Sequence, residues 1–368
     1  MNKEGWTYKI FTDCMEKIPH PKQVKTDEYH PIGRYPVVSQ EEKTIAGYSD
    51  LTEYVYQPPK PVIIFGDHTR VLKYVDFDFI VGADGVKILI PKDDLQTKFL
   101  YYYLKWYKIP NLGYSRHFKL LKEINVPVPP LSVQQRIVSE LDQLSDIIAM
   151  KRKQVEEYDA LTQSVFYEMF GSEQNDYKNY PIFKLSEISE IGTGSTPSRK
   201  QEAFYFNGTI NWVKTTEVHG NLISETEEKI TRRALDETNC KVFPIGTILI
   251  AMYGQGKTRG QVAILNAPAA TNQACAAIIP DYDICDKDYL FTYLKMSYEK
   301  IRGMARGGTQ SNLNLNLVKS IRLPLPPLPL QHAFADKVRA IERQKQLVND
   351  SIREVQTLLD SRMQEYFG

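Results

Sequence analysis

The chain contains 368 residues, and its 46 Lys and Arg side chains nearly balance its 45 Asp and Glu side chains, giving a formal net charge of +1. This length exceeds what one hydrophobic core usually supports, and an apolar fraction of 42% excludes a largely disordered chain. Because nucleic-acid-binding proteins usually carry a basic excess, the net charge by itself argues against that class. The apolar stretches are too short to cross a bilayer and the N-terminal residues lack the apolar core of a secretion signal, so we expect a cytoplasmic protein without a membrane partner.

Apolar runs with the length of strands precede a helical passage twice along the chain, with Gly, Pro, Asn and Asp between them. The first series comprises Val62–Phe65, Phe79–Val81 and Val86–Ile90 before the helical passage Thr97–Tyr107. The second comprises Ile210–Val213, Thr247–Met252, Gln261–Leu265 and Cys275–Ile279 before the passage Tyr289–Met296. Each series predicts a globule of mixed helix and sheet.

A gapless repeat with an offset of 197 residues relates residues 122–171 to residues 319–368. Both copies begin with a strand-like run and a Pro-Pro pair, which ends regular structure because proline lacks the amide donor. A stretch without Pro or Gly follows from Ser132 to Phe170 and from Leu330 to Phe367, which predicts two long helices. The matched residues include Lys122/Lys319, Pro127/Pro324, Pro129-Pro130/Pro326-Pro327, Leu131/Leu328, Gln134/Gln331 and Phe170-Gly171/Phe367-Gly368.

Apolar residues recur in these helices with the spacing of a heptad, which favours a coiled-coil seam. Two copies of one surface can meet about a pseudo-twofold axis, and such an axis makes the paired helices antiparallel. The alternative is that each helix caps its own globule without pairing. The residues expected in the helix pair are Ile137, Leu141, Leu144, Ile148, Val155, Phe334, Val338, Ile341, Val348, Ile352, Val355 and Leu359.

Loops in both globules combine basic, amide and aromatic residues with glycine. Arg, Asn and Gln can make paired hydrogen bonds to base edges, Lys, Ser and Thr suit phosphate oxygens, and Gly allows close backbone approach. Ordinary solvated loops are the alternative for each segment taken singly. In the first globule the candidate DNA-binding residues are Arg34, Tyr35, Gln40, His68, Arg70, Arg116, His117 and Lys119. In the second they are Arg199, Lys200, Trp212, Lys214, Thr215, Tyr253, Gln255, Lys257, Arg259, Gln273, Arg306, Thr309, Gln310 and Asn312.

Sequence motifs for catalysis, nucleotides or metals fail on their spacing. Residues 251–258 imitate a phosphate-binding loop, but Ala251 stands where glycine is required and a strand-like run follows instead of a helix. Asp84 precedes Lys87 in the manner of a nuclease site but has no second carboxylate at metal-site spacing. The four cysteines form no CxxC pair, so they are expected to be buried apolar residues. We therefore expect no catalytic residue and no metal ligand.

The doubled junction, residues 126–135 (VPVPPLSVQQ) and 323–332 (LPLPPLPLQH), each followed by a long helix, carries a family resemblance. The chain resembles the specificity (S) subunit of type I restriction–modification systems over nearly its whole length. Residues 33–40, 194–200, 210–214 and 245–256 are similar to parts of that family's target-recognition domains. His332 in place of a second Gln is a mild departure, and residues 66–70 match residues 254–259 poorly in sequence.

The resemblance implies an α+β fold in which two mixed target-recognition globules, related by pseudo-twofold symmetry, are separated by two long antiparallel coiled-coil helices. Its expected segments are a first target-recognition domain at residues 1–130, a central helix at 131–171, a second target-recognition domain at 172–327 and a C-terminal helix at 328–368. It also implies that each globule reads half of a bipartite, asymmetric double-stranded DNA site while the helices set the spacing.

The resemblance further implies partners that carry the chemistry. The helices would recruit two methyltransferase (M) subunits and, through them, restriction (R) subunits, with S-adenosylmethionine, ATP and Mg bound by those partners and no cofactor in this chain. Two alternatives remain open: a coiled-coil adaptor that binds no DNA, and a specificity subunit of an assembly that contains only methyltransferase. Divided at the expected boundaries, each globule has 18 basic and 16 acidic residues, whereas the central helix has four and seven. The near-zero total charge therefore no longer argues against DNA.

Overall fold

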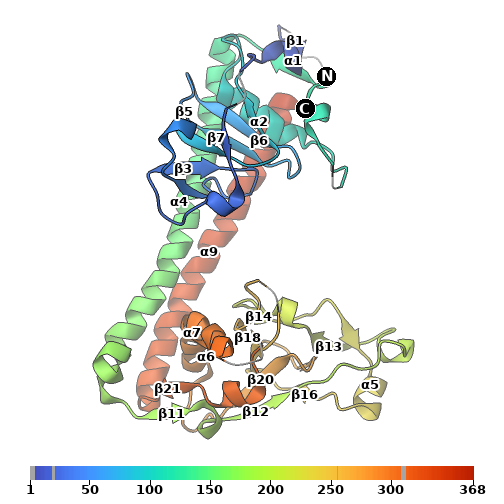
Figure 1. The fold of residues 1–368 in the computed structure, drawn as a ribbon. Helices are drawn as coiled ribbons and strands as arrows, with labels where there is room; N and C mark the ends of the chain where they lie inside the picture. Colours follow the sequence, from blue (N-terminus) through green and yellow to red (C-terminus); the bar gives the residue numbers. More distant parts are fainter. Residues whose placement is uncertain (1–4, 19–20, 114, 255, 308–311) are drawn as a thin grey trace. The chain divides into compact units, whose positions relative to one another are not determined.

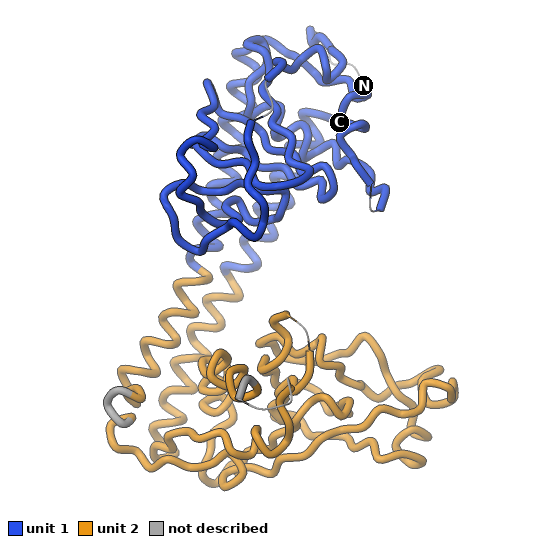
Figure 2. Tube along the Cα trace, viewed as in Figure 1, with its two compact units in different colours: residues 1–154, 348–368 blue, residues 155–347 orange. Residues whose placement is uncertain are grey.

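The computed structural model describes residues 5–18, 21–113, 115–254, 256–307 and 312–368, without the side chains of residues 174–176 and 306–307. The chain forms two compact units, one of residues 1–154 with 348–368 and the other of residues 155–347 (Figure 2). Both unit boundaries fall inside long helices. Each unit therefore unites one globule with a segment of each helix, a grouping that the four segments expected from the sequence do not give.

The two long helices are α4, Leu131–Phe170, and α9, Leu328–Phe367 (Figure 1). Both have 40 residues, so each is about 60 Å long. They begin at the residue directly after each Pro-Pro pair, one or two residues earlier than the sequence predicts. Gly171 follows α4 with a φ of +79°, a backbone conformation that glycine adopts without strain, and so it ends this helix.

The globule of the first unit contains two sheets and a two-stranded ladder. A three-stranded sheet has the order β7-β6-β9, a second has the order β2-β8-β3-β4 with β5 also paired to β8, and β1 pairs with β10. Its elements are β1 (Thr7–Ile10), α1 (Phe11–Cys14), β2 (Gln23–Val24), β3 (Tyr35–Val38), β4 (Gly47–Ser49), β5 (Val55–Tyr56), β6 (Val62–Gly66), β7 (Leu72–Val75), β8 (Phe79–Gly82), β9 (Val86–Leu89), α2 (Thr97–Tyr107), α3 (Phe118–Leu121) and β10 (Asn125–Val128).

The globule of the second unit has a five-stranded sheet, β12-β20-β17-β18-β14, a four-stranded sheet, β15-β13-β19-β16, and the pair β11-β21. Its elements are β11 (Ile182–Lys184), β12 (Ser189–Thr193), β13 (Ile210–Val213), β14 (Leu222–Ile223), β15 (Lys229–Ile230), α5 (Arg232–Glu237), β16 (Val242–Phe243), β17 (Ile248–Ala251), β18 (Val262–Leu265), β19 (Ala269–Thr271), β20 (Cys275–Pro280), α6 (Lys287–Met296), α7 (Tyr298–Gly303), α8 (Leu315–Lys319) and β21 (Arg322–Pro324).

The two globules share a topology that their sequences largely hide. In each, a central strand (β6 or β17) pairs antiparallel with the next strand along the chain and with a later one (β9 or β20). In each, an earlier strand pairs parallel with the strand before that later one, β3 with β8 and β13 with β19. A strand at the start of each globule also pairs with the strand that precedes a Pro-Pro pair, β1 with β10 and β11 with β21. The strand runs predicted from the sequence are confirmed with shifts of one or two residues at their ends.

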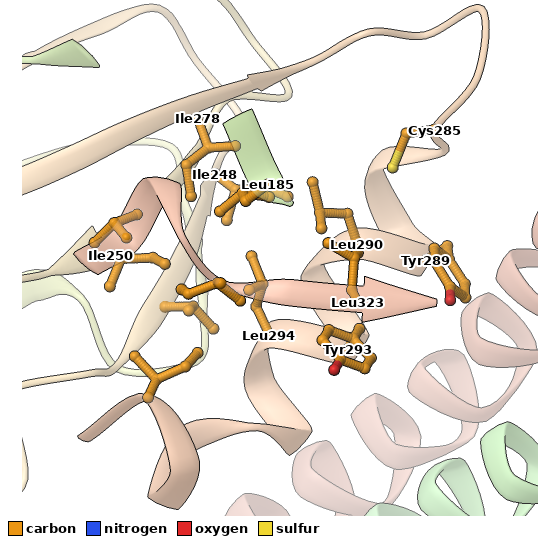
Figure 3. Close-up of a cluster of buried hydrophobic side chains, with 14 of the residues drawn as sticks. Leu185, Ile248, Ile250, Ile278, Cys285, Tyr289, Leu290, Tyr293, Leu294 and Leu323 are labelled. Atoms are coloured by element: carbon orange, nitrogen blue, oxygen red, sulfur yellow. The ribbon is translucent and has the colours of Figure 1, made fainter. Parts of the chain in front are cut away.

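Each core lies between a sheet, a globule helix and the long helices. In the second unit, Leu290 and Leu294 of α6 lie on the side facing Ile248 and Ile278, whereas Tyr289 and Tyr293 lie toward a long helix (Figure 3). In the first unit the core includes Phe99 and Leu100 of α2 together with residues of α4 and α9. The long helices therefore contribute residues to the cores of the globules in addition to packing against each other.

All twelve residues expected in the helix pair are buried or half-buried. In the first unit, Glu140 of α4 accepts hydrogen bonds from Arg362 and Tyr366 near the end of α9. In the second unit, Phe166 and Phe170 at the end of α4 pack against Phe334 near the start of α9, with ring centroids 5.6 and 5.3 Å apart. The start of each helix thus meets the end of the other, so the helices are antiparallel.

A buried glutamine joins each long helix to its globule in the same way. Gln134 Nε2 donates to Asp94 O (2.8 Å) and Pro129 O (2.7 Å), and its Oε1 accepts from the Gln96 amide (2.8 Å), where α2 begins. In the second unit, Gln331 Nε2 donates to the carbonyls of Ile284 (2.9 Å) and Pro326 (2.7 Å), and its Oε1 accepts from the Asp286 amide (2.8 Å), where α6 begins. The repeated glutamine is thus explained by one repeated hydrogen-bond set.

Candidate nucleic-acid interface

Loops from four places in the first unit meet in what we call the first loop cluster, residues 39–43, 66–70, 83–85 and 115–119. The Asp67 amide donates to Gly85 O (2.7 Å), which joins the loop after β6 to the loop before β9. Gln40 Oε1 accepts from the His68 amide (3.2 Å), and Thr69 Oγ1 donates to Gln40 O (2.6 Å). Strands β3 and β8 are parallel, so the residues that follow them lie at one edge of the sheet. The cluster is therefore held by hydrogen bonds to backbone groups, some of them made by the side chains of Gln40 and Thr69.

Lys73 of β7 fixes one of these loops from the inside. Its side chain is buried, and Nζ donates to Ser39 O (2.8 Å) and Lys43 O (2.5 Å). Burial lowers the pKa of Lys73 from its ordinary value of 10.5 to about 8 because it disfavours the charged form. The sequence alone does not indicate this role, because a single lysine in a short strand usually points to solvent.

The protonation of Lys73 predicts a pH dependence of stability. Between about pH 8 and pH 10.5 the folded chain has lost the Lys73 proton while the unfolded chain still holds it, so stability contributed by this group rises with pH across that window. Replacing Lys73 with Met should remove this rise. The test is chemical unfolding of wild type and K73M, measured from about pH 7 to about pH 11 so that the range includes the whole expected rise. Parallel curves for the two proteins would contradict the assignment.

In the second unit, the loops after β13, β17 and β19, the counterparts of β3, β6 and β8, meet the loop after β12. We call this group the second loop cluster, residues 194–200, 214–217, 252–254 with 256–260, and 271–274. The Ser195 amide donates to Thr271 O (2.9 Å), and the Met252 amide donates to Ala274 O (2.8 Å). Thr196 Oγ1 donates to Gln273 Oε1 (2.5 Å). The Met252 bond corresponds to the Asp67 bond of the first unit. The loop at residues 66–70 and the loop at residues 252–260 thus join equivalent strands, although their sequences match poorly.

Two candidate residues are corrected by their burial. His117 is fully buried: its Nδ1 lies 3.0 Å from Asp67 O, and its Nε2 accepts from the Leu112 amide (3.1 Å). Trp212 is 2% exposed and donates from Nε1 to Ser195 O (3.1 Å). Neither ring can reach a base without leaving its core, so both support the loop clusters instead of contacting DNA.

The other candidates are distributed unevenly. Arg34 and Tyr35 lie at the start of β3, the end opposite Gln40, so the structure does not bring them into the first loop cluster. Arg70 belongs to the cluster but donates to Ile109 O (3.1 Å). Apart from Arg34 and Tyr35, the exposed candidates are Arg116, Lys119, Arg199, Lys200, Tyr253, Lys257, Gln273 and Asn312, and the half-buried ones are Gln40, His68, Arg70, Lys214, Thr215 and Arg259. Gln255, Thr309 and Gln310 lie outside the described residues, as does the side chain of Arg306.

Arg199 and Lys214, two of the candidate cations, are bound to carboxylates. Arg199 forms an ion pair with Glu228, and Lys214 Nζ lies 3.0 Å from Glu228 Oε1 and 2.9 Å from Glu227 Oε2. Arg199, through its hydrogen bond, is the main cause that lowers the pKa of Glu228. Neither glutamate is among the DNA-binding candidates that residue type indicated.

Within the described residues, no group of three or more His, Cys, Asp or Glu side chains is arranged to hold a metal ion. No helix in that part of the chain is long and apolar enough to cross a membrane. All four cysteines are free and buried. The arrangement thus offers two sets of polar loops on similar frames.

Comparison with known families decides between the classes that the loops leave open. The profile of the family described as "Type I restriction modification DNA specificity domain" matches residues 3–157 and 177–357. The chain belongs to this family. The two matches coincide with the two globules and most of their following helices, so the domain occurs here twice.

Individual relatives of this specificity-domain family agree. The chain is 28% identical over 343 residues to the EcoR124I/EcoR124II specificity subunit of Escherichia coli, covering 85% of this chain and 80% of that one. It is 32% identical over 163 residues to the MjaIX specificity subunit of Methanocaldococcus jannaschii, covering 43% and 37%. The crystal structure of the type I S subunit from M. genitalium aligns over 100% of this chain and 98% of that chain, with a TM-score of 0.55 and 16% identity, which confirms the fold.

Proposed function

We propose that this chain is the sequence-specific DNA-recognition subunit of a type I restriction–modification complex. Membership in the DNA specificity family is the observation that carries the proposal. The two loop clusters support it, because each presents basic and amide side chains on a frame held by backbone hydrogen bonds, as base reading requires. Each cluster would read one half of a bipartite site. Because the clusters share a frame but not a sequence, the two half-sites would differ.

The chain would act as a non-catalytic subunit in the cytoplasm. The antiparallel helices, whose outer faces expose Met150, Leu161 and Leu347, would set the spacing of the half-sites and recruit two methyltransferase subunits. Restriction subunits would join through them. S-adenosylmethionine, ATP and Mg would then be bound by those partners.

Arg116 and Arg259 provide a test of split recognition. Replacing either with Ala should weaken recognition of one half-site only, because a paired arginine–guanine contact contributes about 1–3 kcal/mol of discrimination. Binding of the complex, purified with its co-expressed partners, to duplexes that carry either half-site unchanged measures this. Equal losses on every duplex would instead mark these side chains as phosphate contacts.

Two other functions predict different results. A coiled-coil adaptor would show no DNA binding by the wild-type complex in a mobility-shift assay. A specificity subunit for a methyltransferase alone would direct adenine methylation without cleavage of unmodified DNA. For either assembly that methylates DNA, the complete restriction–modification complex or the methyltransferase alone, mapping modified adenines in the host genome would identify the half-sites.

A further inference from the structure

We propose that Glu228, supported by Glu227, is a built-in competitor of DNA phosphate in the second loop cluster. It keeps Arg199 and Lys214 neutralised until DNA displaces it, and so weakens binding to DNA that offers phosphates alone. The inference rests on the proposed DNA-recognition function and adds a regulatory residue to that site.

The four side chains form a compact network with equal numbers of opposite charges. Glu228 accepts from both Arg199 and Lys214, and Glu227 Oε2 accepts from Lys214 Nζ (2.9 Å). Glu217 fixes the backbone of this network, because its Oε2 accepts from the Lys214 amide (2.8 Å) and its Oε1 from the Glu227 amide (2.9 Å). The strand pair β13–β15 continues this connection through Asn211 and Lys229. The glutamates are therefore held against the cations by the fold.

Arg199 is positioned for an anion even without Glu228. The Arg199 guanidinium lies 4.5 Å from the ring centroid of Tyr205 and 5.1 Å from that of Trp212. Tyr205 donates to Pro197 O (2.6 Å) and Trp212 donates to Ser195 O (3.1 Å), so these rings are fixed to the loop that carries Arg199. Stacking leaves the guanidinium edge available to an oxygen acceptor. Glu228 occupies that edge in this structure.

Arg199 and Lys214, already paired with glutamates, contribute little to the affinity for DNA phosphates. A protein binds DNA nonspecifically largely by neutralising phosphates and releasing their counterions, with a slope of about −0.9 in log K against log salt for each contact. Arg199 and Lys214 must exchange Glu228 for phosphate, so their contribution to this term is reduced. Neutralising Glu228 should free about one cation, and neutralising Glu227 as well should free about two.

The test uses the full chain purified with its co-expressed partners and a short duplex of random sequence. E228Q should bind this duplex about 3–10-fold more tightly at low salt, and its salt slope should steepen by about 0.9. The E227Q/E228Q double variant should steepen the slope by about twice that amount. Both variants keep the bonds that Glu228 O accepts from the Trp212 amide and from Thr226 Oγ1, because these bonds do not involve the Glu228 side chain.

Glu225 supplies the matched control. It is exposed, lies three residues away, and within the described residues forms no ion pair, so E225Q makes the same change in net charge without freeing a cation. In an R199Q background, the gain from E228Q should shrink. Thermal unfolding of each variant shows whether the fold is kept.

Each outcome has a distinct meaning. If the wild-type complex binds no DNA, the proposed function fails. If it binds DNA but E228Q matches E225Q in affinity and salt slope, or binds more weakly while folded, Glu228 is a structural ion-pair partner and this inference is overturned.

Discussion

Replacing Gln134 with Leu should destabilise the contact between the start of α2 and the start of α4 in the first unit. The change leaves Asp94 O, Pro129 O and the Gln96 amide without their buried partner, and each unpaired buried group costs about 1–3 kcal/mol. We expect a loss of about 3 kcal/mol or more in the local free energy of opening. Hydrogen exchange of the Leu100 amide, which bonds to Gln96 O, measures it.

Gln135 is the control, because it is exposed and its Oε1 accepts a bond from another side chain, Gln96 Nε2 (2.9 Å), instead of from a buried backbone group. Q135L should change protection by less than about 0.5 kcal/mol. Q331L should weaken the second unit instead, at the Leu290 amide, and leave Leu100 unchanged. If Q134L and Q135L had equal effects, the hydrogen bonds of the buried Gln134 side chain would not be what holds the long helix to the globule.

The sequence predicted the long helices and the repeat because both depend on local signals, namely prolines and apolar spacing. It did not show what the repeated Gln does, since that depends on carbonyls brought together only by folding. Some equivalences are hidden by reversed charges. Lys98 Nζ lies 2.8 Å from Asp142 Oδ2, and at the corresponding place in the second unit Asp288 Oδ2 lies 2.5 Å from Arg339 Nη1. Each unit therefore has an ion pair at this place, although the residue types at both positions differ and their charges are exchanged.

The candidate site was predicted less completely than the fold. Residue type indicated which loops were polar, and the structure assembles most of them into two clusters. Residue type could not show that His117 and Trp212 are enclosed by their own loops, or that Glu228 neutralises Arg199. Exposure and pairing depend on contacts between distant segments, which a single sequence does not reveal.

Replacing Gly194 with Ala should disrupt the second loop cluster. A Cβ at this position would lie 1.7 Å from Thr271 O and 2.5 Å from Thr271 C, a clash with backbone that no rotamer change relieves. The ends of β12 and β19 must then separate and break the bond from the Ser195 amide to Thr271 O. Overpacking of this kind costs about 1–3 kcal/mol or more. Thermal unfolding together with binding to each half-site measures both effects.

Gly192 gives the matched control two residues earlier. The nearest atom to a Cβ there is Phe243 Cε1 at 4.0 Å, so G192A should fit and leave both stability and recognition close to wild type. G194A should lose recognition of one half-site while the other, read by the first unit, is retained. Loss of both half-sites by a folded G194A complex would mean that the clusters do not read DNA independently. Unchanged recognition would mean that residues 194–200 are not part of the reading surface, whatever their charge.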